Sequence, residues 1–252
     1  MSRITFLHDA NLGFPVQNQQ WLRWFASHHC TVEGSTDLAA LQTRLESEPN
    51  LLAYLPVACL DRLRARSQIQ GVASATVGSS GLSTTTSVLI VKRGRDLNTL
   101  PDLNGATYAR INAFCTSSQL APALLLHQHG LRYPQLFAQV LEVAVQPGQW
   151  QHQIDQVLDG HADATMVDEA TWLASPQNIE HTQVLGRVDG LPCPVVLSNA
   201  VDEPALVAAF KQQLLSFRRD PAAMFSGFVA YPEASLHAFL DGLDRCTSAG
   251  PG

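Results

Sequence analysis

A short polar run near the middle of the chain has the residue types needed to hold an oxyanion. Residues 115–118 read Cys-Thr-Ser-Ser, follow an apolar segment and open a long helical pattern. The first N–H groups of a helix lack intrahelical partners and carry a partial positive charge. Hydroxyls at that position either cap the helix or donate to a bound anion. The run therefore predicts an anion cradle at Thr116, Ser117 and Ser118, with a plain helix cap as the alternative.

A second candidate is a carboxylate at the end of a predicted strand. Asp168 directly follows the strand pattern of residues 162–167. In open α/β sheets, ligands bind outside the carboxyl ends of the strands. Asp168 can therefore pair with a ligand amine or hydroxyl, or it can cap the helix predicted over residues 169–174.

Two further groups lie near predicted strand ends. Tyr54 closes an apolar strand, and its phenol either reaches into a cleft or packs beneath the following loop. Residues 83–87 are five consecutive hydroxyl residues, which include Thr85, Thr86 and Ser87. These hydroxyls can line a pocket, although Thr is also favoured in strands for its β-propensity.

Catalysis and metal binding have weaker support. Cys115 precedes a helix start, which lowers a thiol pKa, so a nucleophilic role is conceivable. No motif supplies a base for it, and the nine histidines show no metal-ligand spacing. We therefore predict no catalytic residue, no metal and no cofactor.

The elements that must position these residues alternate between strands and helices. Hydrophobic periodicity predicts strands at residues 4–7, 51–54, 68–77, 84–92, 106–112, 137–145, 162–167, 181–187 and 192–198. It predicts helices at residues 19–27, 36–45, 57–66, 116–129, 150–159, 169–174, 203–217 and 233–243. This alternation indicates an α/β protein whose sheets are mostly parallel and flanked by helices.

The strand–helix succession starts afresh after Lys92, and a late strand precedes the last two helices. This order predicts two lobes, one inserted into the other. The expected lobes are residues 1–92 with 193–252, and residues 93–192, joined by crossover strands at 88–92 and 194–198.

The composition and net charge of the chain limit the kinds of partner that we expect. Hydrophobic residues make up 46% of the 252 residues, and the formal net charge is -6 without any run of Lys or Arg, so nucleic acid is not an expected partner. Five scattered cysteines without a CxxC predict reduced thiols. The sequence shows no signal-peptide pattern and no long apolar stretch, which predicts a cytoplasmic chain that is not embedded in a membrane, or a periplasmic one if a signal peptide has been removed.

Several motifs, in order, resemble a known family. Residues 87–93 read SVLIVKR, residues 98–105 read NTLPDLNG, and residues 115–118 open a helix that contains Pro122. Residues 160–168 read GHADATMVD, and LPCPVVLSN follows at 191–199. This succession resembles the phosphonate-, phosphite- and phosphate-type substrate-binding proteins of ABC transporters, in the type II periplasmic-binding-protein superfamily. The resemblance covers roughly residues 50–218.

The resemblance implies a two-lobed fold that holds an oxyanion through hydroxyls and N–H groups at a helix start, in a cleft between the lobes. By this resemblance, the family's ligand-binding positions correspond to Thr116, Ser117, Ser118 and Asp168, and more loosely to Tyr54 and residues 85–87. The chain departs from the family pattern in three places, where Cys115 replaces a hydroxyl residue, Ser118 replaces a glycine and Thr85 replaces an aromatic residue. These changes leave a carboxylate, a sulfonate or another organic solute open as the ligand.

The sequence thus favours a non-enzymatic solute-binding protein for a small anionic solute, with an ABC transporter permease as its implied partner. Two alternatives stay open. One is a cytoplasmic sensor or regulatory module with a cytoplasmic partner. The other is an enzyme on the same scaffold, for example one related to pyrimidine synthesis for thiamine, that uses Cys115.

Overall fold

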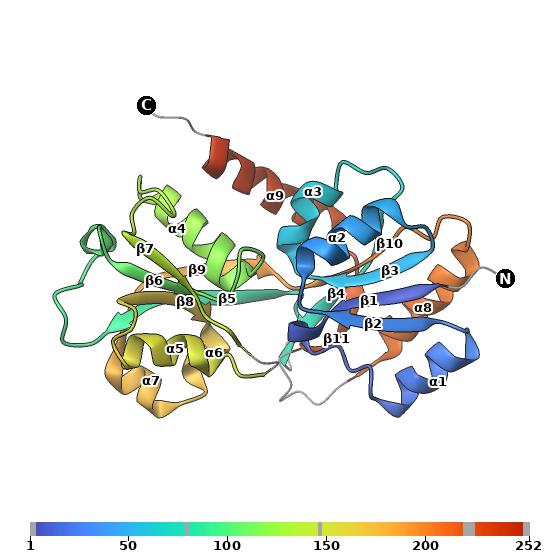
Figure 1. Ribbon diagram of the computed structural model, residues 1–252, viewed down its shortest axis with the longest axis horizontal. Coiled ribbons are helices and arrows are strands. Elements are labelled where there is room, and N and C mark those ends of the chain that lie inside the picture. The colour runs from blue at the N-terminus through green and yellow to red at the C-terminus, as the bar shows by residue number, and fades with distance from the viewer. Residues whose placement is uncertain (1–3, 79–80, 146–147, 219–224, 249–252) are drawn as a thin grey trace. The chain divides into compact units, whose positions relative to one another are not determined.

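The chain forms two compact units. The computed structural model describes residues 4–78, 81–145, 148–218 and 225–248 (Figure 1). Unit 1 consists of Met1–Ser83 and Cys193–Leu236, and unit 2 of Thr84–Pro192 and His237–Gly252. The borders between the units lie before Thr84, after Pro192 and within the C-terminal helix.

Unit 1 contains a six-stranded mixed sheet in the order β11-β4-β10-β3-β1-β2. Its strands are β1 (Thr5–Asp9), β2 (Thr31–Ser35), β3 (Leu51–Leu55), β4 (Gln70–Val77), β10 (Val195–Ser198) and β11 (Phe225–Ala230). Strand β1 pairs in parallel with β2 and β3, while the β3–β10, β10–β4 and β4–β11 ladders are antiparallel.

Helices cover both faces of this sheet (Figure 1). They are α1 (Gln19–Ser27), α2 (Leu38–Ser47), α3 (Leu60–Leu63) and α8 (Pro204–Ser216), and α9 (Glu233–Ser248) begins in this unit. Trp21, Trp24 and Phe25 lie at helical spacing on α1 and pack with Phe210 of α8 into an aromatic core. The Asn18 side chain caps α1 by accepting from the Gln20 N–H at 2.8 Å, which explains why this helix begins where the sequence predicts.

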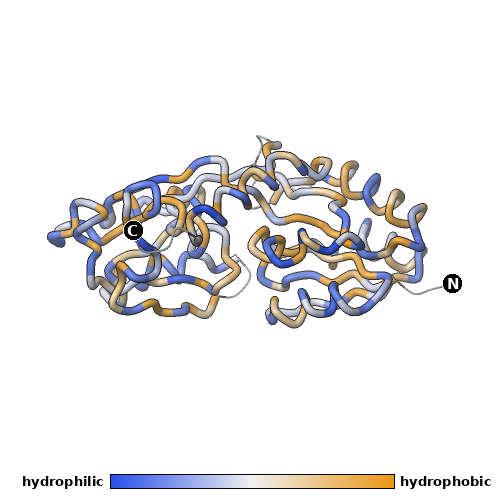
Figure 2. The backbone as a smooth tube through the Cα atoms, turned by 90° about the horizontal axis from the view of Figure 1, so that it is seen from above, coloured by the Kyte–Doolittle hydropathy of each residue, from blue (hydrophilic) through white to orange (hydrophobic). Residues whose placement is uncertain are grey.

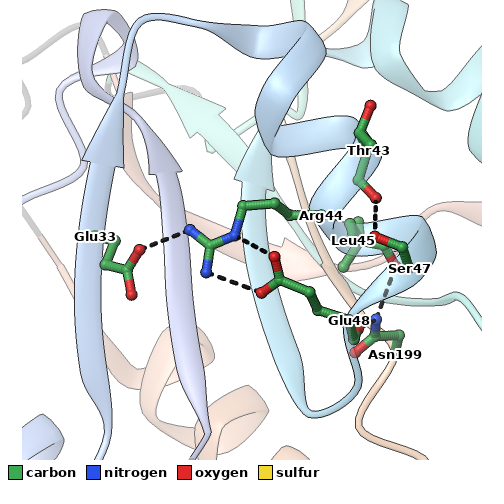
Figure 3. Close-up of polar contacts among 7 residues, drawn as sticks. All are labelled: Glu33, Thr43, Arg44, Leu45, Ser47, Glu48 and Asn199. Atoms are coloured by element: carbon green, nitrogen blue, oxygen red, sulfur yellow. Dashed lines mark hydrogen bonds and ion pairs between the residues drawn. The ribbon is translucent and has the colours of Figure 1, made fainter.

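Asn199 joins two distant parts of unit 1 (Figure 3). Its Nδ2 donates to the carbonyls of Leu45 and Glu48 at 2.7 and 2.6 Å, and its Oδ1 accepts from the Leu51 N–H at 2.7 Å. This one side chain therefore provides hydrogen-bond partners for backbone groups at the end of α2 and at the start of β3. Arg44 lies nearby and contacts Glu33 and Glu48 at the surface (Figure 3).

Unit 2 contains a five-stranded sheet in the order β7-β6-β8-β5-β9. Its strands are β5 (Thr84–Lys92), β6 (Thr107–Arg110), β7 (Gln139–Glu142), β8 (Ala164–Asp168) and β9 (Thr182–Pro192). The β6–β7 and β6–β8 ladders are parallel, and β5 runs antiparallel to both β8 and β9.

The helices of unit 2 divide between the two faces of its sheet (Figure 1). Helix α4 (Ala121–Gln128) lies on one face, and α5 (Gln151–Leu158), α6 (Glu169–Leu173) and α7 (Pro176–His181) lie on the other. Because successive strand residues point to opposite faces, Leu89 and Val91 of β5 pack on the α4 side, while Val88 and Ile90 pack against α5. Hydrophobic and hydrophilic stretches alternate along the backbone of both units in a way that matches this layering (Figure 2).

The α/β class is confirmed, but the prediction of mostly parallel sheets is wrong. Helix-linked neighbours such as β1 and β2 are parallel, whereas β5 and β10 pair with strands that no single helix connects to them. Each of these two strands, predicted to cross between lobes, lies wholly within one unit. None of the helices in the described part of the chain is long and apolar enough to cross a membrane.

Candidate functional site

The polar run at residues 115–118 forms the turn through which β6 leads into α4. We call these residues the 115–118 turn. The turn opens η5 (Thr116–Leu120), a single turn of π-helix that continues directly into α4. The Cys115 carbonyl accepts from the N–H groups of both Gln119 and Leu120, at 3.0 and 3.3 Å. The Cys115 Sγ caps the same turn by accepting from the Ser118 N–H at 3.4 Å.

Ser118 anchors the turn to β6 from below. Its side chain is fully buried, and its Oγ accepts from the Ile111 N–H at 3.1 Å. Tyr108 of β6 donates its hydroxyl to the Ser118 carbonyl at 2.9 Å. Ser118 therefore shapes the turn and presents no group to solvent. Tyr108 was not singled out from the sequence, although a Tyr on the strand before a polar turn is a detectable signal.

Other groups of the turn remain available to a ligand. Within the described residues, no acceptor meets the backbone N–H groups of Thr116 and Ser117, and the Thr116 hydroxyl makes no hydrogen bond. Thr116 is partly exposed, and Ser117 retains 8% exposure. Two adjacent unpaired amides and a hydroxyl at a helix start are a suitable arrangement of donors for an oxyanion.

Asp168, at the end of β8, lies beside this turn. It pairs in register with Ser87 of β5, and Thr85 donates its hydroxyl to Asp168 Oδ1 at 3.2 Å. Ser117 lies near the same carboxyl, where its hydroxyl favours the ionised form of Asp168. Burial raises the pKa of Asp168 to about 6, against the opposing effect of the Thr85 and Ser117 hydroxyls. The Asp168 side chain makes no capping bond to α6, so the helix-cap alternative for this side chain is not what the structure shows.

Cys115 is held as a neutral thiol. Its Sγ lies 3.3 Å from the Ser117 Oγ. Burial raises the pKa of Cys115, and the nearby Asp168 charge raises it further, while the Ser117 and Ser118 hydrogen bonds act in the opposite direction. The expected lowering of this thiol pKa by the helix start is therefore wrong, because burial outweighs the effect of the helix end.

Ser87 lies beneath the same cluster. It is fully buried, and its Oγ has no hydrogen-bond partner in the described structure. Its register partner Asp168 faces the same side of the sheet. The residues that the structure brings together are Cys115, Thr116, Ser117, Asp168, Thr85 and Ser87, with Ser118 beneath the turn.

Two predicted residues lie elsewhere. Thr86 donates its hydroxyl to Asp189 at 2.7 Å, and the same Asp189 oxygen accepts from the Arg187 Nε at 2.9 Å. Tyr54 belongs to unit 1, is 1% exposed, and packs with its ring centroid 5.3 Å from that of Phe14. Tyr54 therefore takes the alternative of packing within a core.

A charged group that sequence reasoning missed lies close to the start of α4. Arg110, the last residue of β6, donates to Gln119 Oε1 and to Glu142 Oε1, both at 2.7 Å. Tyr133 donates its hydroxyl to the same Gln119 oxygen at 2.7 Å. The position of Arg110 at a strand end was the available signal. Its contacts fix Gln119, which follows the turn, so Arg110 supports the geometry of the site.

In the described residues, neither a metal-binding cluster nor a surface depression adds to this turn. Among the residues that the structure describes, no group of three or more His, Cys, Asp or Glu side chains could hold a metal ion. An open depression on unit 2 is lined by residues 94–97, 102, 104–106 and 163, and it shares no residue with the 115–118 turn. Within it, Asp163 is bonded to Arg95 and to the Thr107 N–H.

Two α/β units with mixed sheets, each built from two separate stretches of the chain, are consistent with the type II periplasmic-binding-protein fold. Solved structures agree with this class. A Xanthomonas citri protein bound to ATP is similar with a TM-score of 0.76 and 16% identity, over 100% of both chains. A binding protein component of an ABC phosphonate transporter from Pseudomonas aeruginosa has a TM-score of 0.69 and 14% identity, over 99% of this chain and 90% of the other. PhnD1 from Prochlorococcus marinus, in complex with methylphosphonate, has a TM-score of 0.70 and 13% identity, over 96% and 97%.

The family follows from the sequence match. The family model for the periplasmic phosphonate substrate-binding proteins of ABC transporters matches residues 31–234, and the chain belongs to this family. No curated protein sequence matches the chain. Members of the family are solute-binding components that work with ABC transporter permeases.

Proposed function

We propose that this protein binds a small phosphonate-type oxyanion at the 115–118 turn of unit 2. The observation that carries the proposal is that the N–H groups of Thr116 and Ser117, at the start of η5 and beside the Thr116 hydroxyl, meet no acceptor within the described residues. Three such donors can bind one ligand oxygen or two oxygens of the same tetrahedral group. Family membership and the methylphosphonate complex of a structurally similar protein support the ligand class.

The turn is preorganised for this role. Its backbone is fixed from below by Ser118, which bonds to Ile111 and Tyr108, and from the side by the Cys115 cap. A rigid set of donors loses less entropy on binding than a flexible one, so little ordering opposes capture of the anion. The proposed role is therefore binding and delivery to a transporter permease.

Binding without catalysis is part of the proposal. Cys115, the only thiol in the 115–118 turn, has a raised pKa, so its reactive thiolate form is disfavoured at neutral pH. Its bonding neighbours are Ser117 and Ser118, and neither is a base that could activate it. The nearby Asp168 carboxyl accepts a hydrogen bond from the Thr85 hydroxyl, which suits a structural and recognition role.

The proposal is tested by removing one hydroxyl at the turn. Thr116→Val keeps the shape of the side chain, and loss of a hydrogen bond to a charged ligand weakens affinity roughly 10- to 100-fold. Isothermal titration calorimetry with methylphosphonate, and then with inorganic phosphate, measures this change. The Thr116 hydroxyl has no partner in the described structure, so the variant is expected to fold as the wild type does.

Thr86→Val is the matched control. It makes the same chemical change on β5, but its hydroxyl bonds to Asp189 and not to the turn. Its affinity for methylphosphonate should equal that of the wild type. Equal losses in both variants, or no binding of either anion by the folded wild type, would contradict the assignment.

A further inference from the structure

A charged pair lies at the same edge of the unit 2 sheet as the 115–118 turn. Arg110 and Glu142 are the last residues of β6 and β7, two parallel strands that pair these residues in register. Strand β8 is also parallel to β6, so all three strands end at one edge, where ligands of open α/β sheets bind. Because alternate strand residues share a face, Arg110 lies on the same face as Tyr108, which bonds to Ser118. The charged pair is therefore on the side of the sheet that carries the turn.

The guanidinium of Arg110 is held firmly on one side and by a single bond on the other. Its Nη1 donates to Gln119 Oε1 at 2.7 Å, and Tyr133 donates to the same oxygen. Its Nη2 donates to one oxygen of Glu142, also at 2.7 Å. The Nε, which shares an edge of the guanidinium with Nη2, is buried and has no hydrogen-bond partner in the described part of the chain. This edge therefore has one acceptor where a carboxylate could supply two.

Glu142 is an acceptor that another carboxylate can replace. Its side chain is 58% exposed, whereas that of Arg110 is 22% exposed. An ion pair with such an exposed partner adds little to stability, so its displacement costs little. The Arg110 Nε–H has already lost its water, so a new acceptor forms a hydrogen bond there without a further desolvation penalty on that atom. Two parallel bonds from a guanidinium to a carboxylate are also stronger than one.

Building on the proposed oxyanion site, we infer that Arg110 recognises a second anionic group of the ligand, a carboxylate that replaces Glu142 on the Nε–Nη2 edge. The ligand class is then a carboxyalkylphosphonate, with its phosphonate at the 115–118 turn and its carboxylate at Arg110. In the free protein, Glu142 takes the part of that carboxylate. Gln119 links the two ends of the site, because it directly follows the turn and accepts the Nη1 bond.

Isothermal titration calorimetry of the full chain can compare ligands that differ only at the tail. Phosphonoacetate, 3-phosphonopropionate and 4-phosphonobutyrate are each paired with the alkylphosphonate of equal carbon number. We call the Kd of the alkylphosphonate divided by that of its carboxylate partner the tail ratio. Hydrogen bonds to charged groups are strong enough that the largest tail ratio should be roughly 10 to 100. The tail length that gives this maximum measures the gap between the turn and Arg110.

Three variants separate recognition of the tail from support of the turn. Arg110→Gln should reduce the tail ratio to about one, and any loss shared by both ligands of a pair cancels in this ratio. Glu142→Gln removes the competing carboxylate and should raise the tail ratio about two- to fivefold. Glu169→Gln is the matched control, because Glu169 also pairs with an arginine of unit 2, Arg187, and it should leave the tail ratio as in the wild type. If Arg110→Gln fails to fold, Glu142→Gln still decides the matter.

Failure of this inference differs from failure of the oxyanion site. A tail ratio of about one for all three pairs, with measurable binding of the alkylphosphonates, would overturn the role of Arg110 and leave the oxyanion site in place. The same conclusion follows if Arg110→Gln does not lower the tail ratio, or if Glu169→Gln raises it as much as Glu142→Gln does. If the folded wild type binds no member of the series, the proposed function itself fails.

Discussion

Asp168 lies beside the proposed ligand site, and ionisation of its buried carboxyl should lower the free energy of unfolding. Its carboxyl has a pKa near 6 in the folded chain, against 3.8 for the unperturbed group. A raised folded pKa means that the folded state binds the proton more tightly than the unfolded state, so stability falls as the pH rises through this interval. Above about pH 6 the free-energy cost of ionising this buried carboxyl is fully present. A pKa shift of about two units corresponds to about 3 kcal/mol of stability.

Replacement of Asp168 by Asn removes the ionisation while keeping the size of the side chain. The Asn amide can still accept from the Thr85 hydroxyl, which now donates to Asp168 at 3.2 Å. We expect the variant to be more stable than the wild type by up to about 3 kcal/mol at about pH 8, with the difference vanishing near pH 4. Urea unfolding in the absence of ligand, at several pH values, measures this difference.

The comparison between variant and wild type matters because a second carboxyl contributes to the same trend. Burial also raises the pKa of Asp9 in unit 1 to about 6. The pH dependence of the wild type alone therefore mixes two groups. Asp9→Asn serves as the matched variant, and the double variant should show the sum of both effects. The reasoning is refuted if Asp168→Asn is no more stable than the wild type at about pH 8.

Three further outcomes test the packing and can be measured by urea unfolding. Asn199→Leu should cost roughly 2–4 kcal/mol, because it leaves the carbonyls of residues 45 and 48 and an amide buried without partners; a loss below about 1 kcal/mol would argue against these contacts. Arg44→Gln, at a residue also drawn in Figure 3, should lower the free energy of unfolding by no more than about 1 kcal/mol, because the ion pairs of Arg44 are solvent-exposed. Gly186→Ala should cost roughly 1–3 kcal/mol, because its Cβ would lie 2.5 Å from Leu125 Cδ2, and unchanged stability would show that Leu125 moves freely.

Much of the fold is readable from local patterns. The helix over residues 19–27 and the strand over residues 84–92 were predicted with the bounds that the structure shows, because cap chemistry and periodicity coincide there. Strand β2 was missed because its sequence, TVEGS, is an edge strand without a buried alternation. Strand β11 was missed as well, and its pairing with β4 contains a register shift. The direction of β5 and β10 depends on tertiary pairing, which periodicity does not encode.

The candidate site was predictable as a set of strand ends and a helix start, but not in its orientation. The sequence could not show which of the three hydroxyls at residues 116–118 faces outward. The π-helical turn decides this, because it turns Ser118 inward to Ile111 and leaves Thr116 partly exposed. Similarly, adjacent residues Thr85 and Thr86 differ in role because one bonds Asp168 and the other Asp189.

The place of β10 in its sheet has a consequence for how the chain matures during synthesis. This strand lies between β3 and β4, yet it is supplied by residues 195–198, after every strand of unit 2 has been made. As the nascent polypeptide leaves the ribosome, unit 2 can close its sheet by Pro192, while β3 and β4 still expose bare hydrogen-bonding edges. Such edges promote aggregation. A ribosome stalled so that residue 192 has left the exit tunnel but residues 195–198 have not should therefore display a protease-resistant unit 2 and an aggregation-prone unit 1 that depends on chaperones.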